Sequence, residues 1–128
     1  MSTQINAVTL GVKEMKRSKE FYEGLGFEVD KEHPAFISFK QGDGAAVLGL
    51  YPQDGLATLI GIPAAASSGF VGFVLNYNPS SKDRVDEVLA QAKKAGGKIL
   101  KPAHDSEWGG RQGHFSDPDG YVWQVSSY

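Results

Sequence analysis

The sequence contains no cysteine among its 128 residues. This absence excludes disulfide bonds, thiolate metal sites and a nucleophilic cysteine, and it is typical of an intracellular, cytoplasmic protein. Long apolar runs are also absent, since no stretch approaches the roughly 20 residues that span a bilayer. Residues 1–6 are mostly polar and lack the basic and apolar regions of a signal peptide. We therefore expect neither membrane association nor secretion.

The chain also lacks an excess of either charge. Its 13 basic and 15 acidic residues leave a net charge of -2, and neither sign forms a block that would follow a phosphate backbone. The glycine-rich segments 42–44 and 109–110 lack the Lys-Ser/Thr ending of a phosphate-binding loop. We therefore predict no nucleic-acid partner and no nucleotide site.

The residues that are present indicate a single domain built from two similar halves. The length fits one domain, which would bury roughly 68% of the surface of its unfolded chain. Module one covers about 4–52 and module two about 69–128, and residues 53–68, with their prolines, glycines and alanine triplet, are interpreted as a linker or mobile loop. Apolar periodicity predicts helices over 15–24 and from a Ser80 or Ser81 cap to Ala95, and strands over 5–12, 27–30, 36–40, 45–51, 70–77, 98–101, 110–116 and 121–126.

Each half thus has the order β-α-β-β-β and is too small to bury its own sheet face well. We predict an α+β fold in which two βαβββ modules form one curved mixed sheet, with the helices on the outer face and a cleft on the concave face. The side chains assigned to the core include Phe21, Tyr22, Phe27, Phe73, Tyr77 and Trp123.

Two segments resemble one known family. Residues 8–27 read VTLGVKEMKRSKEFYEGLGF, with a strand and then a Ser-x-x-Phe-Tyr-x-x-Leu-Gly-Phe helix, and residues 108–128 read WGGRQGHFSDPDGYVWQVSSY, with a Phe-x-Asp-Pro-Asp-Gly turn. The chain resembles the vicinal-oxygen-chelate superfamily, of the glyoxalase, bleomycin-resistance and extradiol-dioxygenase type. The resemblance implies the paired-module fold, but this fold hosts lyases, dioxygenases, epimerases, thiol transferases and drug-binding proteins.

The resemblance also locates the positions that hold a divalent metal in the metal-dependent members. They fall here on Ala7, on Gly49 or a neighbour within 47–51, on Gly72 and on Gln124. Alanine and glycine have no donor side chain, and neutral glutamine lacks the charge with which a carboxylate binds a cation. The chain is therefore similar to a member that has lost its metal ligands, and we predict no metal and no cofactor.

The candidate site residues follow from strand alternation and from one loop. His114 precedes Phe115, so alternation points it away from the core and towards the cleft. Trp108 lies beside two glycines and could close over a planar ligand, whereas Arg111 could pair with a ligand carboxylate or be an ordinary surface arginine. The predicted ligand-binding residues are Thr9, Tyr51, Asn76, Trp108, Arg111, His114 and Gln124.

Other polar residues are given structural roles. His33 and His104 are interpreted as solvated loop histidines, and Asp117 and Asp119 as turn residues that bind backbone amides. The predicted function is a metal-free protein that binds a small, partly aromatic ligand. The alternatives are a lyase, isomerase or dioxygenase-like enzyme that uses His114 or a metal site at other positions, and a protein-interaction domain. The resemblance further implies a homodimer.

Overall fold

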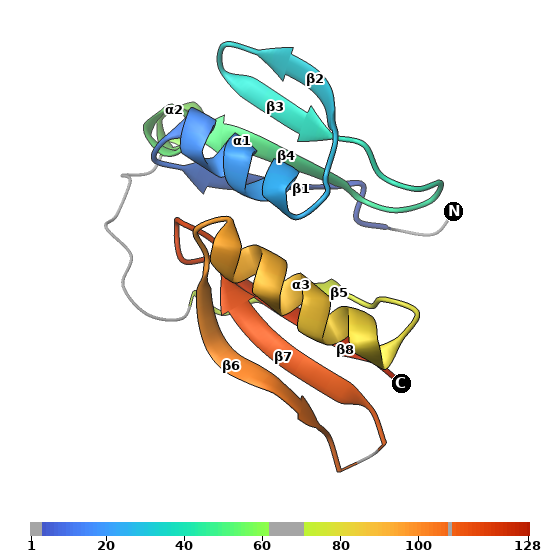
Figure 1. The fold of residues 1–128 in the computed structure, drawn as a ribbon. Coiled ribbons are helices and arrows are strands. Elements are labelled where there is room, and N and C mark those ends of the chain that lie inside the picture. The colour runs from blue at the N-terminus through green and yellow to red at the C-terminus, as the bar shows by residue number, and fades with distance from the viewer. Residues whose placement is uncertain (1–3, 62–70, 108) are drawn as a thin grey trace. The chain divides into compact units, whose positions relative to one another are not determined.

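The computed structural model describes residues 4–61, 71–107 and 109–128. The chain divides into two compact units, Met1–Ala66 and Ser67–Tyr128 (Figure 1). The first unit contains β1 (Ala7–Val12), α1 (Met15–Gly24), β2 (Val29–His33), β3 (Phe36–Phe39), β4 (Val47–Pro52) and α2 (Gln53–Ile60). The second contains β5 (Leu75–Tyr77), α3 (Lys82–Lys94), β6 (Lys98–Asp105), β7 (Arg111–Ser116) and β8 (Val122–Ser127).

The first unit is a four-stranded sheet of order β1-β4-β3-β2 with α1 on one face. β1 and β4 pair in parallel, and the other neighbours are antiparallel. Ser18, Phe21 and Tyr22 are the buried residues of α1, and their spacing of three and four residues places them on one side of the helix. The ring of Tyr22 lies 5.7 Å from that of Phe39 on β3. The core of this unit is completed by Leu10, Val12, Ile37, Leu48 and Leu50.

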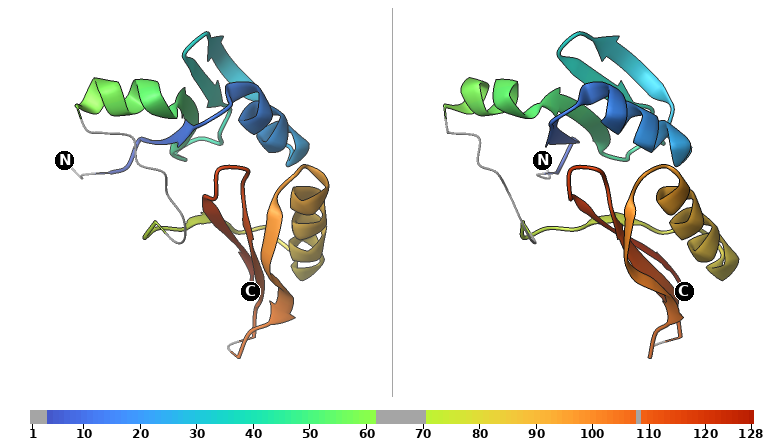
Figure 2. Two further views of the ribbon diagram at one scale, coloured as in Figure 1. Left: turned by 90° about the vertical axis from the view of Figure 1, so that its left-hand side faces the viewer. Right: turned by 60° about the vertical axis from the view of Figure 1, so that its left-hand side comes forward.

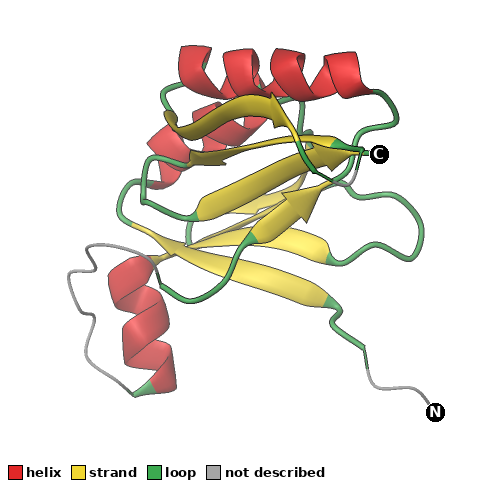
Figure 3. Ribbon diagram, turned by 90° about the horizontal axis from the view of Figure 1, so that it is seen from below, coloured by secondary structure: helices red, strands yellow, loops and turns green. Residues whose placement is uncertain are grey.

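The linker interpretation of residues 53–68 is wrong for its first part, which forms α2. The helix follows β4 directly (Figure 3). Pro52 precedes the helix at its N-cap, where its missing N–H costs no helical hydrogen bond, and Gly61 ends it in the left-handed conformation with φ 87°. A Cβ on Gly11 would lie 3.4 Å from the Cα of Gln53, so the glycine lets α2 approach β1 closely. The rest of the proposed linker, from residue 62, lies outside the described residues.

The second unit repeats the arrangement with the sheet order β5-β8-β7-β6. Helix α3 lies along one face of this sheet and contacts β6, β7 and β8 (Figure 2). Ser81 caps the helix, because its Oγ accepts a hydrogen bond of 3.3 Å from the backbone N–H of Arg84. Val85, Val88, Leu89 and Ala92 form its buried stripe.

The turn before β8 has the structural role that the sequence predicts. The Oδ1 atom of Asp117 accepts hydrogen bonds of 2.9 Å from the backbone N–H groups of Asp119 and Tyr121. Gly120 adopts a φ of 92°, which L-residues with a Cβ rarely adopt. Asp117 is only 3% exposed, so its carboxylate serves the turn.

The predicted α+β fold of two βαβββ modules is confirmed, but hydrogen bonds group the strands into two four-stranded sheets instead of one. The core assignment is right for Phe21, Tyr22 and Trp123, whereas Phe27 is half-buried. It is wrong for Phe73 and Tyr77, which are 41% and 42% exposed. The reason is that β5 has three residues instead of the predicted eight and lies at the edge of its sheet, so Phe73 precedes the strand.

No helix among the described residues is long and apolar enough to span a membrane.

Candidate functional site

Strand pairing divides the second sheet into a covered face and an opposite face. Phe115 and Trp123 pair across β7 and β8, stack at a centroid distance of 6.0 Å, and are buried on the side of α3. Because successive side chains of a strand point to opposite sides, the next row of paired residues belongs to the other face. We call this the open face of the second sheet. The row consists of Asn76 on β5, Gln124 on β8, His114 on β7 and Lys101 on β6.

His114 and Gln124 are joined by a hydrogen bond of 3.1 Å between Nε2 and Oε1. An amide oxygen only accepts, so Nε2 of His114 carries the hydrogen and is the donor. Both residues are half-buried, and the described residues offer no other side-chain hydrogen bond to either. Gln124 therefore orients the imidazole ring.

Asn76 completes the group of predicted residues that the structure brings together. It is exposed on the edge strand β5 and lies opposite Gln124 in the parallel pairing of β5 with β8. Its side chain makes no hydrogen bond to the other described residues. Three adjacent strands thus place two amides and an imidazole in one row. Side chains that are direct neighbours across paired strands are close enough to interact.

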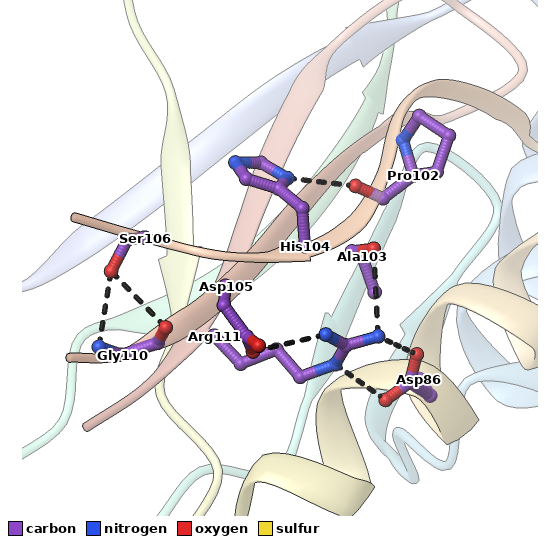
Figure 4. Close-up of polar contacts among 8 residues, drawn as sticks. All are labelled: Asp86, Pro102, Ala103, His104, Asp105, Ser106, Gly110 and Arg111. Atoms are coloured by element: carbon purple, nitrogen blue, oxygen red, sulfur yellow. Dashed lines mark hydrogen bonds and ion pairs between the residues drawn. The ribbon is translucent and has the colours of Figure 1, made fainter.

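Arg111 lies away from this group, on the helix-covered side of the sheet. Its Nε and Nη2 donate to the two carboxylate oxygens of Asp86 on α3, at 2.8 and 2.9 Å, and its Nη1 donates to Asp105 at 3.1 Å (Figure 4). These bonds raise the pKa of Arg111, and the hydrogen bond from Arg111 lowers the pKa of the Asp86 carboxyl below its usual value. The guanidinium of Arg111, which was predicted to pair with a ligand carboxylate, is therefore paired with carboxylates of its own chain.

The lowered pKa of Asp86 predicts an acid-dependent contribution to stability. The ion pair stabilises the folded protein at pH values above the ordinary pKa of 3.8, and the contribution is lost as the pH falls through the lower folded-state pKa. Asp86→Asn should lower the melting temperature slightly near neutral pH, and the two proteins should converge well below pH 3.8. Thermal unfolding over a pH series measures this, with Asp43→Asn, which changes an exposed loop carboxylate, as control. A difference that persists in acid would contradict the assignment.

Thr9 and Tyr51 belong to the first unit, where they share one face of its sheet. Thr9 is exposed and pairs with Gly49, and Tyr51 is half-buried and pairs with Gly11. A Cβ on Gly55 of α2 would lie 3.4 Å from Cε1 of Tyr51, so the tyrosine ring packs on the helix that follows it. Thr9 and Tyr51 are therefore not part of the row on the second sheet, and their role in ligand binding stays a prediction.

Trp108 lies outside the described residues. Near it in the sequence, the Oγ of Ser106 donates to the carbonyl of Gly110 at 3.1 Å and accepts from the N–H of Gly110 at 3.0 Å (Figure 4). Gly109 has a φ of 93°.

The positions of the family's metal ligands do not fit a divalent ion. A Cβ on Gly49 would meet the ring of Phe36 at 3.0 Å, and Gly72 precedes β5 with a φ of 98°. The Oε1 atom of Gln124 already accepts the hydrogen bond of His114. The described residues contain no group of three or more His, Asp or Glu side chains that could hold a metal ion.

His104 is a residue that sequence reasoning placed wrongly. It lies within β6 opposite Gln112 and is half-buried, and its Nδ1 donates to the carbonyl of Pro102 at 2.9 Å. Its ring points to the side of β6 opposite Arg111 (Figure 4). The predicted strand ended at residue 101, but β6 continues through Pro102 to Asp105, because it is an edge strand, where proline is tolerated.

Comparisons with known proteins agree with this architecture. A family model described as the Glyoxalase/Bleomycin resistance protein/Dioxygenase superfamily matches residues 4–125. The chain is similar to the structure of a glyoxalase-related enzyme from Fulvimarina pelagi, with a TM-score of 0.89, 26% identity, and coverage of 99% of this chain and 89% of the other. It shares the fold of a glyoxalase/bleomycin resistance protein/dioxygenase family enzyme from Burkholderia phytofirmans PsJN, with a TM-score of 0.85, 19% identity and 98% coverage of both chains. A comparison with curated proteins finds no match.

Proposed function

The chain belongs to the Glyoxalase/Bleomycin resistance protein/Dioxygenase superfamily, and from this premise we propose that it binds a small, partly aromatic molecule without a metal ion, against the open face of the second sheet. The observation that carries the proposal is the row of Asn76, Gln124 and His114. Polar side chains withdrawn from water usually find hydrogen-bond partners in the protein, in ordered water or in a ligand. Here only His114 and Gln124 bind each other.

Apolar contacts for such a ligand are available beside the row. Val122 pairs with Ser116 and lies two residues before Gln124 on β8, so it belongs to the same face. The rings of Phe73 and Tyr121 lie 6.0 Å apart just before β5 and β8, and Phe73 is 41% exposed. Val122 thus offers a planar ligand an apolar contact beside the polar row.

The donor set argues against a metal in this role. Ala7, Gly49 and Gly72 have no side-chain donor, and Gln124 is neutral and bound to His114. A hard or borderline cation prefers carboxylate and imidazole ligands held together in one cluster. The proposal therefore relies on hydrogen bonds and apolar contact for affinity.

Elemental analysis and a thermal-shift screen test this function together. We expect no stoichiometric metal, no stabilisation by divalent ions, and a rise in melting temperature with an aromatic compound, since a ligand at about 100 times its Kd stabilises the folded state by about 2.7 kcal/mol. The rise should shrink in His114→Ala and persist in His33→Ala, which changes an exposed histidine on β2. Stoichiometric metal, or a metal-driven rise in melting temperature, would instead favour the enzyme alternative.

The family assignment also leads us to propose a cytoplasmic homodimer. Sedimentation at micromolar concentration would reveal the oligomeric state.

A further inference from the structure

We infer that His104 on β6 is a further ligand-binding residue of the open face of the second sheet, and that its Nε2 atom recognises a hydroxyl group of the ligand. The inference rests on the proposed function and adds one residue and one chemical group to it. It comes from an irregularity in the pairing of β6 with β7, which places this side chain on the open face.

The irregularity is an extra residue in β6 between Lys101 and His104. Lys101 pairs with His114, and His104 pairs with Gln112, so three steps along β6 match two steps along β7. Regular pairing would have placed His104 opposite Arg111, on the helix-covered side of the sheet. The extra residue moves it to the open face instead, as bulges do where they redirect a side chain. Figure 4 shows its ring on the side of β6 opposite Arg111.

The packing of the second unit holds the bulge in place. After the bulge, Asp105 accepts a hydrogen bond of 3.1 Å from Nη1 of Arg111 on the helix-covered side. Beside the bulge, Gly113 leaves room for the backbone of β6, because a Cβ there would lie only 3.2 Å from the backbone nitrogen of Ala103. The position of His104 on the open face is therefore set by contacts on the other side of the sheet.

The hydrogen bonds of His104 decide which ring nitrogen a ligand can reach. Nδ1 lies 2.9 Å from the carbonyl oxygen of Pro102 and donates to it, because a carbonyl only accepts. Among the described residues, Nε2 has no hydrogen-bond partner, and it is not one of their buried side-chain atoms that lack a partner. The half-buried ring thus leaves Nε2 as its polar atom for a ligand.

A hydroxyl group matches Nε2 in either protonation state of the ring. It donates to the lone pair of a neutral imidazole and accepts from the N–H of an imidazolium, whereas a carboxylate only accepts. His104 is also within reach of a ligand at the row described above. His114 lies diagonally from it across β6 and β7, and diagonal neighbours are separated by roughly 7–8 Å. A two-ring aromatic molecule beside His114 can therefore extend a hydroxyl group to His104.

Three matched aromatic probes test this inference by equilibrium dialysis with the full chain. 2-Naphthol carries the hydroxyl group, 2-methylnaphthalene replaces it by a methyl group of similar size, and 2-naphthoate replaces it by a carboxylate. We expect 2-naphthol to bind about ten-fold more tightly than either comparison probe, because a probe without the hydroxyl leaves Nε2 unpaired. His104→Leu should remove the preference for 2-naphthol over 2-methylnaphthalene, and His104→Gln, which keeps a polar group near the position of Nε2, should restore part of it. His33→Leu, the same change at an exposed histidine of β2, should retain the preference.

Each other outcome overturns the inference. Equal affinity of the wild type for 2-naphthol and 2-methylnaphthalene would show that the hydroxyl is not recognised, and the binding function itself would stand. Tighter binding of 2-naphthoate would assign the residue to anions. An equal loss of affinity for both probes in His104→Leu would give His104 a structural role only. If none of the three probes binds, the inference fails, and the proposed function is then judged by the separate screen of other aromatic compounds. Circular dichroism confirms that His104→Leu is folded, and His104→Ala with the same loss of preference gives the second variant.

Discussion

Replacement of Tyr22 by alanine is expected to lower the free energy of unfolding by about 3–5 kcal/mol, the typical cost of removing a buried aromatic side chain. Tyr22 is 0% exposed, and its ring centroid lies 5.1 Å from that of Phe21 and 5.8 Å from that of Phe27. Helix α1 has only 10 residues, a length at which packing and not helix propensity supplies stability. Urea unfolding followed by far-ultraviolet circular dichroism measures the effect.

The control for this variant is Tyr77→Ala. Tyr77 is 42% exposed on the edge strand β5, so its loss should cost less than about 1 kcal/mol. A cost for Tyr22→Ala no larger than that for Tyr77→Ala would contradict the burial of Tyr22 in the ring cluster beneath α1.

The second large effect is expected at Gly113, where alanine should destabilise the second unit by about 1–3 kcal/mol. An added Cβ would collide with Cδ1 of Leu89 on α3 and would lie 3.1 Å from the carbonyl oxygen of Lys101 and 3.2 Å from the backbone nitrogen of Ala103. Leu89 can change its rotamer, but the backbone of β6 cannot rotate away. The strand would therefore have to shift beside His114.

Gly42→Ala is the matched control, because no atom lies within 4 Å of a Cβ at that position and its φ is not positive. The unfolding midpoint in urea should fall for Gly113→Ala and remain near that of the wild type for Gly42→Ala. Equal midpoints for the wild type and Gly113→Ala would contradict the close approach of α3 and β6 to β7.

Gly113→Ala also provides a link between stability and the proposed site. Gly113 directly precedes His114 on β7, so a displaced β6 or β7 would disturb the hydrogen bond between His114 and Gln124. Ligand binding should then weaken even under conditions in which the variant is folded.

Parts of the site followed from strand alternation alone. His114 and Gln124 are the sequence neighbours of the buried Phe115 and Trp123, so alternation predicts that they share the opposite face. In the structure the two residues are register partners across β7 and β8. The same rule, applied from Phe115 back to Arg111, would have placed the arginine on the helix side. The interpretation of Arg111 rested on its charge and left both a ligand carboxylate and an ordinary surface role open.

Other features depended on partners that are distant in the sequence. Arg111 binds Asp86, which is 25 residues away on another element, and this pairing decides where the guanidinium lies. His104 belongs to a strand because β6 continues past Pro102 at a sheet edge. Neither the Arg111–Asp86 pair nor the continuation of β6 leaves a periodic pattern in the sequence, because each depends on residues of separate elements.

The sequence by itself determined the features that depend on neighbouring residues. Helix α1 occupies the predicted residues 15–24, Ser81 caps α3, and the turn at Asp117 and Gly120 follows from local hydrogen bonds and backbone geometry. Only the tertiary structure decided that residues 53–60 form a helix against Gly11, that the strands form two sheets, and that Gln124 binds His114. The physical reason is that backbone preferences act over a few residues, whereas packing, strand register and side-chain pairing join residues that the sequence separates.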